Sequence, residues 1–440
     1  MTAQELGQIK GRWFALKIAA FLSDTAAHKA ALTLLDQCLV SATNFLTGVI
    51  IGRACTKEEF GLYMLGFSIV SFLLVLQDTL ISTPYTVYSP RLSCRVLTQF
   101  TGSTFIHQSI LSAMSVVVLV AGGAAVSFGI GPLSLGPVIW ALVGVIAFIM
   151  LRNFVRRLCF AGLQIKTALV LDTCIGIIQI GGLFVLYRLG LLSSSLAYCV
   201  IGFACGTVAV GWLIKNRRAF ILRFDKAFPD FRRNWALGRW ILAESLISAG
   251  SSYIYPWIVA AFHGVVSAGV WAACAAVANI GNPLVFALFN FLGPQMAHTY
   301  ARRGSVGLRS LVLKSSIISC ITMIPFSIVA LVFSEQLVVC FYGSKYAGNG
   351  PTVFILALSL VPTALGLSCS AALLALERAD VGFLINLVVL IVILTFGVWL
   401  VRLSGPLGAA YAVLIANTAS SAARIVAFII LAHGRLRRLP

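Results

Sequence analysis

Charged side chains are scarce in this sequence: Asp, Glu, Lys and Arg together make up 10% of its 440 residues, whereas apolar residues make up 60%. A soluble globule of this composition would leave a large apolar surface in water, so the composition predicts a protein whose solvent is lipid. Apolar runs of about 20 residues recur along the chain, and this is the length that a helix needs to cross the hydrocarbon core. The short alternating strands of an outer-membrane barrel are missing. We therefore expect an all-α polytopic membrane protein.

Catalytic and metal-binding motifs are missing as well. The sequence has no Walker A loop, no GxSxG and no HExxH, and its five His residues are scattered. Its eleven Cys residues form no CxxC pair, so they are predicted to be small buried hydrophobes rather than disulfides or zinc ligands. We expect no enzyme, no cofactor and no metal site. A membrane glycan polymerase or ligase is a disfavoured alternative, because the outside loops are short and nearly free of acids and His.

The net charge of +19 raises the question of a nucleic-acid partner, and the positions of the charges answer it. If the N-terminus is cytoplasmic, 26 of the 32 Lys and Arg residues lie in inside segments, five lie outside, and Arg424 lies within a span. This asymmetry predicts a multi-pass protein of the inner membrane with both termini cytoplasmic. Insertion and anionic lipid account for the positive charge, so we expect membrane lipids and no nucleic acid as partners.

Twelve transmembrane spans are predicted, arranged as two six-helix lobes around a central cavity. An N-terminal segment, 1–31, contains an interfacial amphipathic helix over 9–22. An N-lobe over 32–214, a basic linker over 215–239, a C-lobe over 240–432 and a basic tail over 433–440 follow. The predicted spans are 32–52, 62–83, 104–128, 133–151, 168–188, 195–214, 240–262, 268–292, 311–334, 351–376, 382–402 and 407–432.

The two lobes show traces of an internal repeat. At an offset near 208 residues, Asp36 matches Glu244 and Gly61 matches Gly269, and at an offset of 214 residues Asp172 matches Asn386. Both copies begin on the same side of the membrane. The pattern is typical of parallel repeats related by an axis along the membrane normal, although chance similarity between apolar helices is an alternative.

Polar side chains within the predicted spans are the candidates for function, because an intramembrane charge is costly unless it faces a cavity or a partner. Five charges lie there, each near the cytoplasmic end of its helix, and we expect them to surround one vestibule. The acids are candidates for coupling transport to H⁺ or Na⁺: Asp36, Asp78, Asp172 and Glu244. Helix packing and snorkelling are the alternatives for single residues. The substrate-binding candidates include polar residues on the same helical stripes: Arg424, Asn417, Asn44, Asn282 and Asn290.

Several stretches resemble one known family. RACTKEEFGLYMLGFSI (53–69), LISTPYTVYSPR (80–91), CFYGSKY (340–346) and GPLGAAYAVLIANTAS (405–420) resemble the polysaccharide flippase branch of the multidrug, oligosaccharidyl-lipid and polysaccharide exporter superfamily. The resemblance implies a V-shaped transporter that moves lipid-diphosphate-linked glycans outward across the bacterial inner membrane. It also implies cationic residues in the lumen, for which Arg424 is the match, with Arg53 and Arg156 at opposite rims. Acids outnumber Arg within the spans, which departs from the family pattern.

We therefore expect a secondary transporter that flips a polyprenyl-diphosphate-linked oligosaccharide by alternating access. Glycan polymerases and glycosyltransferases are candidate partners. A cation or drug antiporter of the same superfamily is the main alternative, and such a protein would need acids and little Arg in its lumen. A scaffold without transport activity is a further alternative, but it gains nothing from the cost of charges inside the membrane.

Overall fold

The computed structural model describes residues 25–130, 132–376 and 378–436, and in these residues all regular structure is helical. The predicted interfacial helix over 9–22 and residues 437–440 of the predicted tail lie outside them. The long and short α-helices are α2 (Thr25–Ala54), α3 (Lys57–Gln77), α4 (Thr83–Tyr88), α5 (Cys94–Ser127), α6 (Gly136–Ala161), α7 (Ile165–Arg188), α8 (Ser194–Lys215), α9 (Phe224–Tyr253), α10 (Tyr255–Ala278), α11 (Asn282–Tyr342), α12 (Gly350–Leu358), α13 (Leu360–Ala375), α14 (Ala379–Val392) and α15 (Val398–Leu436). The π-helical and 3₁₀ turns are η1 (Asp78–Ser82), η2 (Ser89–Arg91), η3 (Leu133–Leu135), η4 (Arg217–Ala219), η5 (Asn279–Gly281), η6 (Ser344–Tyr346) and η7 (Ile393–Gly397).

The described residues contain ten helical stretches that are long and apolar enough to cross a membrane. Two of these stretches, Ile241–Gly281 and Asp380–Ala432, contain an internal break at a glycine in the left-handed region, Gly264 with φ of 79° and Gly405 with φ of 55°. A third such glycine, Gly304 with φ of 57°, divides α11 and lies two residues after the start of the stretch Arg302–Tyr342. A residue with a Cβ is strained in this conformation, so glycine is the residue that permits the chain to reverse there. Each of the two stretches therefore makes two passes, and the twelve predicted spans are confirmed.

The helices of the second half are interrupted more often than those of the first. In the second half, α9 ends before Pro256, η5 precedes Pro283, and α12 ends before Pro362. Proline lacks the N–H that would bond one turn back, so the helix bends or breaks next to it. In the first half, the π-helical turn η1 precedes Pro84 in the same way.

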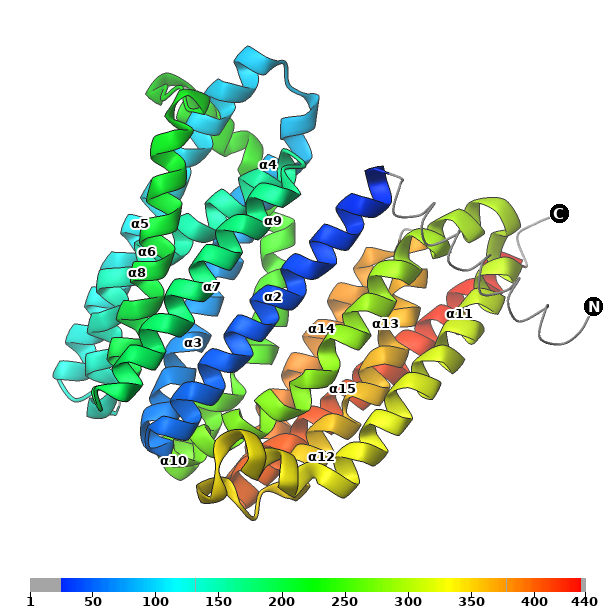
Figure 1. Cartoon of the computed structure of the whole chain (residues 1–440). Coiled ribbons are helices and arrows are strands. Elements are labelled where there is room, and N and C mark those ends of the chain that lie inside the picture. Colours follow the sequence, from blue (N-terminus) through cyan, green and yellow to red (C-terminus); the bar gives the residue numbers. More distant parts are fainter. Residues whose placement is uncertain (1–24, 131, 377, 437–440) are drawn as a thin grey trace, which may run out of the picture.

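The helices form two lobes that diverge from a common end (Figure 1). Helices α2 to α8 pack as one lobe, and α10 to α15 as the other, with α3 and α10 in extensive contact between them. We call the end at which α2 ends and α3 begins the closed end, and the opposite end, where α2 begins, the open end. If both termini are cytoplasmic, as the charge distribution predicts, the open end faces the cytoplasm.

Two glycines make the contact between the lobes at the closed end. A Cβ atom added to Gly61 of α3 would lie 2.2 Å from the carbonyl oxygen of Val265, and one added to Gly269 of α10 would lie 2.1 Å from that of Lys57. The sequence matches Gly61 with Gly269 at an offset of 208, and the same offset matches Lys57 with Val265. Such reciprocal contacts are what two equivalent helices make where a two-fold axis passes between them. The two lobes therefore meet at equivalent positions of the two repeats, on α3 and α10.

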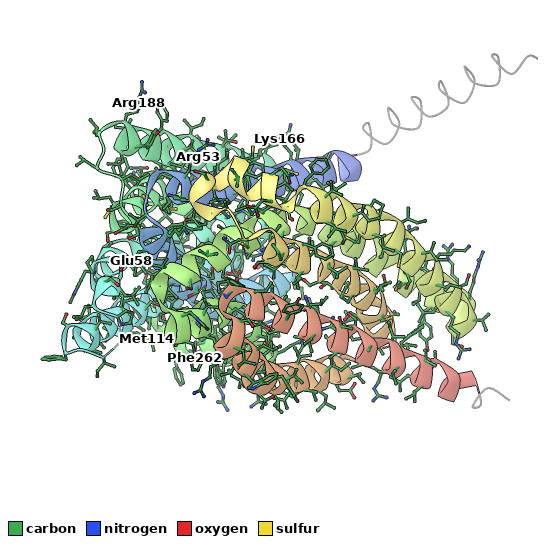
Figure 2. All side chains as sticks on the ribbon, turned by 90° about the horizontal axis from the view of Figure 1, so that it is seen from below. Arg53, Glu58, Met114, Lys166, Arg188 and Phe262 are labelled. Atoms are coloured by element: carbon green, nitrogen blue, oxygen red, sulfur yellow. The ribbon has the colours of Figure 1, made fainter. Side chains whose placement is uncertain are left out.

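The chain segment between the lobes is attached to the N-lobe. The backbone N–H of Ile221 donates to the carbonyl of Thr98 at 3.2 Å, and His107 Nε2 lies 2.8 Å from the carbonyl oxygen of Ala227. Helix α9 thus runs from the N-lobe surface at the open end into the C-lobe. The outer surface of the bundle is apolar, as a lipid-facing surface must be. Met114 and Phe262, labelled in Figure 2, are both exposed.

Candidate functional site

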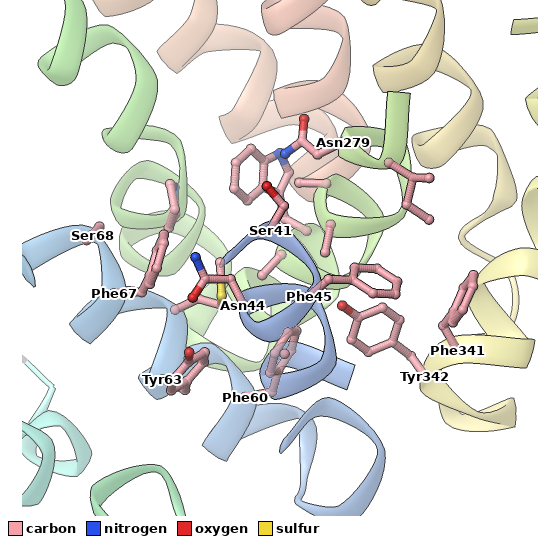
Figure 3. Close-up of a pocket in the computed structure, with 18 of the residues that line it drawn as sticks. Ser41, Asn44, Phe45, Phe60, Tyr63, Phe67, Ser68, Asn279, Phe341 and Tyr342 are labelled. Carbon is pink, nitrogen blue, oxygen red and sulfur yellow. The ribbon is translucent and has the colours of Figure 1, made fainter. Parts of the chain in front are cut away.

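A central cavity of about 570 Å³ lies between the lobes next to the closed end. Helices α2 and α3 of the N-lobe and α9, α10 and α11 on the other side form its wall, so neither lobe encloses it alone. Aromatic rings dominate the lining (Figure 3). The aromatic residues are Phe45, Phe60, Tyr63, Phe67, Tyr253, Trp271, Phe341 and Tyr342. This volume lies in the range of about 300–1,000 Å³ that is typical of small-molecule sites.

The polar groups of the central cavity are all uncharged. Asn44 is exposed in the middle of the lining side chains, and Asn279 accepts a hydrogen bond from Asn282 Nδ2 at 2.9 Å (Figure 3). Trp271 Nε1 and the Tyr342 hydroxyl are buried and have no hydrogen-bond partner among the described residues. No Asp, Glu, Lys, Arg or His is found among the described residues that line this cavity. The site therefore offers ring faces, amides and hydroxyls to a ligand.

A second cavity of about 340 Å³, which we call the hydroxyl-lined cavity, adjoins the first toward the open end. The two cavities share Ser252 and Tyr253 of α9. Ser248 and Ser252 of α9 line it together with Thr79 and Asp78 of η1. A path from the open end to the central cavity thus changes from hydroxyl-rich to aromatic.

Two of the candidate acids lie inside the N-lobe, paired with arginines of α6. Arg156 donates through Nε to Asp172 Oδ2 at 2.6 Å and through Nη2 to Asp36, while Arg152 donates to the other oxygen of Asp172. Asp36 is 0% exposed and Asp172 is 3% exposed. The helical spacing explains the arrangement, because Arg152 and Arg156 are four residues apart in α6 and therefore lie on the same face of that helix. The two acids and two arginines form a neutral cluster.

The third acid is paired in the same way. Asp78 accepts hydrogen bonds from Arg157 Nη2 at 2.7 Å and Nε at 3.1 Å, and from Asn153 Nδ2 at 3.0 Å. Asn153 also donates to Gln77, which in turn donates to Gln108 at 2.8 Å. This network ties α3, α5 and α6 together beside the hydroxyl-lined cavity. Gln77 and Asn153 are not among the residues predicted from the sequence, although both are polar residues within or next to apolar runs.

In the C-lobe, the embedded arginine is bound by an amide rather than by a carboxylate. Arg424 on α15 donates through Nη2 to Asn386 Oδ1 at 3.0 Å, its Nε is buried without a partner, and no carboxylate of the described residues lies within 4.0 Å of it. Asn386 is the residue that the repeat matches with Asp172, so the same position accepts from an arginine in both lobes. Glu244 is exposed and close enough to interact with Arg424 electrostatically.

Arg53 lies at the closed end, at a contact between the lobes. It donates to the carbonyl of Cys340 at 3.1 Å, near the end of α11, and Lys345 donates in return to the carbonyls of Arg53 and Cys55, near the end of α2. A cation beside the last carbonyls of a helix is favoured by the helix dipole. Each lobe thus supplies the cation that caps a helix of the other. We call these contacts of Arg53 and Lys345 the closed-end latch.

The predicted vestibule residues therefore do not form a single ring. Asp36 and Asp172 are buried with Arg156, which lies inside the N-lobe rather than at a rim, and Arg53 belongs to the closed-end latch. Asn44 lines the central cavity and Asn282 reaches it through Asn279. Asn417 is half-buried on α15 and lines neither cavity, and the side chain of Asn290 lies outside the part of the chain that the structure describes.

No protein-family model matches the chain, and no curated protein sequence matches it. Solved structures share its fold. An inward-facing multidrug resistance MATE family transporter of the MOP superfamily aligns with a TM-score of 0.75 and 13% identity over 91% of this chain and 96% of that chain. The lipid II flippase MurJ in an inward closed conformation aligns at 0.70 and 12% identity over 91% and 87%. An outward-facing MATE transporter aligns at 0.62 and 16% identity over 93% and 95%.

At these identities the likeness shows the fold: two lobes of six helices, as in MOP-superfamily transporters. It agrees with the fold that the resemblance of the sequence motifs implies.

Proposed function

We propose that this protein is a flippase that moves a polyprenyl-diphosphate-linked oligosaccharide outward across the bacterial inner membrane by alternating access. Both termini are cytoplasmic in this proposal, so the open end admits substrate from the inner leaflet. Glycosyltransferases would supply the lipid-linked glycan, and a polymerase would use it on the other side. The fold of MOP-superfamily transporters supports the transport activity, and the arrangement of charges supports this substrate.

The main observation in support of this substrate is that arginines neutralise the three embedded acids of the N-lobe. Asp36 and Asp172 are bound by Arg152 and Arg156, and Asp78 is bound by Arg157. A transporter of cationic drugs needs carboxylates that a cation can reach, because a buried charge must be compensated by its partner. In the N-lobe that compensation comes from the protein itself. A cationic drug would therefore meet carboxylates whose charge an arginine already balances.

Arg424 supplies charge of the opposite sign. Its guanidinium has one amide acceptor and an unpaired Nε among the described residues, so hydrogen-bond donors remain for a diphosphate. In our proposal the diphosphate enters at the open end beside Arg424, and the glycan extends through the hydroxyl-lined cavity into the central cavity. The polyprenyl chain stays in the bilayer between the lobes.

Asp36 is the residue that we propose for coupling to a proton or sodium gradient. Its Oδ2 accepts from Arg156, whereas its Oδ1 is buried and has no partner among the described residues. An unpaired buried carboxylate oxygen is costly, and a proton or ion bound there would remove the cost. Asp172, Asp78 and Glu244 remain candidates for the same role. Dissipating the ion gradient and replacing Asp36 by Asn are each expected to stop transport.

A multidrug antiporter is the second candidate, and one observation favours it. The central cavity is aromatic, uncharged and of drug-binding size, and a structure that aligns over 91% of the chain is a multidrug transporter. Aromatic, apolar pockets bind many drug-sized molecules. Such a protein would export cationic dyes.

The test uses the purified full-length protein in vesicles and measures both activities. One arm follows a polyprenyl-diphosphate-linked oligosaccharide from one leaflet to the other, and the second follows efflux of a cationic dye. Arg424→Gln is expected to slow flipping by about ten- to a hundredfold, because hydrogen bonds to a charged group contribute about 1.5–3 kcal/mol. Arg402→Gln, which removes an exposed arginine from the pass that precedes the break at Gly405, is the matched control and is expected to leave flipping unchanged.

Each outcome decides between the candidates. Flipping that depends on Arg424 and not on Arg402, without dye efflux, supports the flippase. Dye efflux without lipid flipping supports the antiporter and overturns our proposal. Deleting the protein from its cell provides a second test, since the lipid-linked intermediate is then expected to accumulate on the inner leaflet.

A further inference from the structure

The central cavity and the embedded charges occupy different parts of the molecule. The described lining of the central cavity contains no Asp, Glu, Lys, Arg or His. Arg152 and Asp172, which are paired with each other, line a separate N-lobe cavity of about 180 Å³ that shares Asn44, Tyr63 and Phe67 with the central cavity. Asp78 and Arg157 lie beside the hydroxyl-lined cavity, and Arg424 lies in the C-lobe. A substrate that carries a diphosphate and a glycan therefore meets two kinds of surface. The part of the substrate that enters the central cavity finds no counter-charge there.

The lining is suited to a ring with an apolar face and hydroxyl edges. A pyranose presents C–H groups on its faces, which pack well on aromatic rings, and hydroxyls around its edge. Rings stand on both sides of the cavity, from Phe45 and Phe67 on the N-lobe helices to Trp271 and Phe341 opposite. An apolar chain would also fit such walls, but it would leave the polar groups of the cavity unpaired.

Those polar groups match hydroxyls and not ions. The amide of Asn44 both donates and accepts, as a hydroxyl does. Asn279 is a second exposed amide in the lining, and the exposed side chain of Ser41 adds a hydroxyl. A ligand that pairs with these groups keeps the hydrogen bonds that they would otherwise make with water. Uncharged polar groups thus line a space that is walled by rings.

Binding of an acidic sugar in the central cavity is disfavoured by desolvation of its carboxylate. Its carboxylate would leave water and reach no Lys or Arg of the described lining, and an uncompensated charge in a low-dielectric site is strongly disfavoured. The nearest embedded arginines of the N-lobe, Arg152 and Arg156, are already bound by Asp172 and Asp36. The neutral cluster therefore leaves no strong attraction for a further anion.

We infer that the central cavity binds uncharged pyranose rings, and that the protein selects neutral over acidic lipid-linked glycans. The inference rests on the proposed function and adds the substrate class. It divides the substrate between two places: the diphosphate at the open end beside Arg424, and neutral sugars against the aromatic walls near the closed end.

The experiment compares two lipid-linked probes in vesicles that contain the full-length protein. Both carry the same polyprenyl diphosphate and a disaccharide, and they differ only in the terminal sugar, which is glucose in one and glucuronic acid in the other. The neutral probe is expected to be flipped at least about tenfold faster, which corresponds to about 1.4 kcal/mol in the barrier. Asn44→Lys is expected to reverse the preference at least in part, because it places a cation in the cavity, and Ser41→Lys does so from the neighbouring turn of α2.

The outcomes separate this inference from the proposed function. Equal flipping of both probes, or faster flipping of the acidic one, overturns the selectivity and leaves the flippase proposal standing. Flipping of neither probe overturns both. A gain of acidic-probe flipping in either lysine variant is a result that mere loss of structure does not give. If both lysine variants fold and neither accelerates the acidic probe relative to the neutral one, the placement of the sugar is wrong.

Discussion

The contact between Gly61 and Gly269 gives the most direct test of alternating access in this chain. Gly269→Ala would place a Cβ 2.1 Å from the carbonyl oxygen of Lys57, and real Cβ contacts are essentially never shorter than 3.0 Å. Helices α3 and α10 must therefore separate by about 1 Å where they now touch, and such overpacking costs about 1–3 kcal/mol. The cost falls only on conformations that are closed at this end.

A penalty on one conformation shifts the population toward the other. A cost of about 1–3 kcal/mol corresponds to a shift of about five- to 150-fold toward conformations that are open at the end where Gly61 and Gly269 meet. Gly61→Ala clashes with Val265 at 2.2 Å and is expected to act in the same direction. Because both substitutions push the same two helices apart, the double variant is expected to shift the population by less than the product of the two single effects.

The assay labels Ser41→Cys, an exposed position in the wall of the central cavity, with a maleimide that does not cross the membrane. Mass spectrometry of the labelled peptide separates this position from the eleven native Cys residues. Labelling from the closed side is expected to rise in Gly269→Ala. Gly181→Ala in α7 is the control, because a Cβ there meets nothing within 4 Å. Equal labelling in the Gly269 and Gly181 variants would refute the conclusion that this contact closes the cavity.

Three further predictions concern the latch, the ionic cluster and a buried thiol. Lys345→Ala removes the cation that caps the end of α2. This variant is expected to increase labelling of Ser41→Cys in the central cavity from the closed side. An unchanged labelling rate would contradict the prediction. Asp172→Asn leaves Arg156 with one carboxylate partner. Because breaking a buried ion pair costs about 3–5 kcal/mol, the thermal unfolding temperature of this variant in detergent is expected to fall. An unchanged unfolding temperature would argue against a stabilising role of the cluster. Burial raises the pKa of the Cys55 thiol to about 11. Alkylation of Cys55 is therefore expected to accelerate about tenfold per pH unit from pH 7 to 10, and to stay slower than alkylation of the exposed Cys94. Fast alkylation of Cys55 at pH 7 would show that this thiol is accessible.

The sequence predicts the membrane, the helices and the repeat because these depend on local composition. Apolar runs long enough to cross a bilayer identify each pass, whereas the breaks at Gly264 and Gly405 are seen only in the structure. The match between Gly61 and Gly269 is readable because both copies of a repeat keep a small residue where their helices touch. The boundaries of the two lobes in the sequence remain a prediction.

The candidate site is predicted less well, for a reason that α6 illustrates. The apolar run ends near residue 151, but the helix continues to Ala161 and includes Arg152, Arg156 and Arg157. Counted as loop charges, these arginines indicate orientation and nothing more. Because they remain helical, they are held on fixed faces and bind acids that the sequence assigns to a vestibule.

By itself, the sequence determined that this chain is a helical membrane protein with twelve passes and charges inside the bilayer, since each of these follows from residues close together in the chain. The internal repeat follows from matches between the two halves of the same sequence. Only the tertiary structure decided which charges neutralise one another and what the central cavity presents. Asp36 and Arg156 are 120 residues apart, and the cavity takes its walls from helices between Ser41 and Tyr342. Partners so distant in sequence are chosen by packing, which no local pattern specifies.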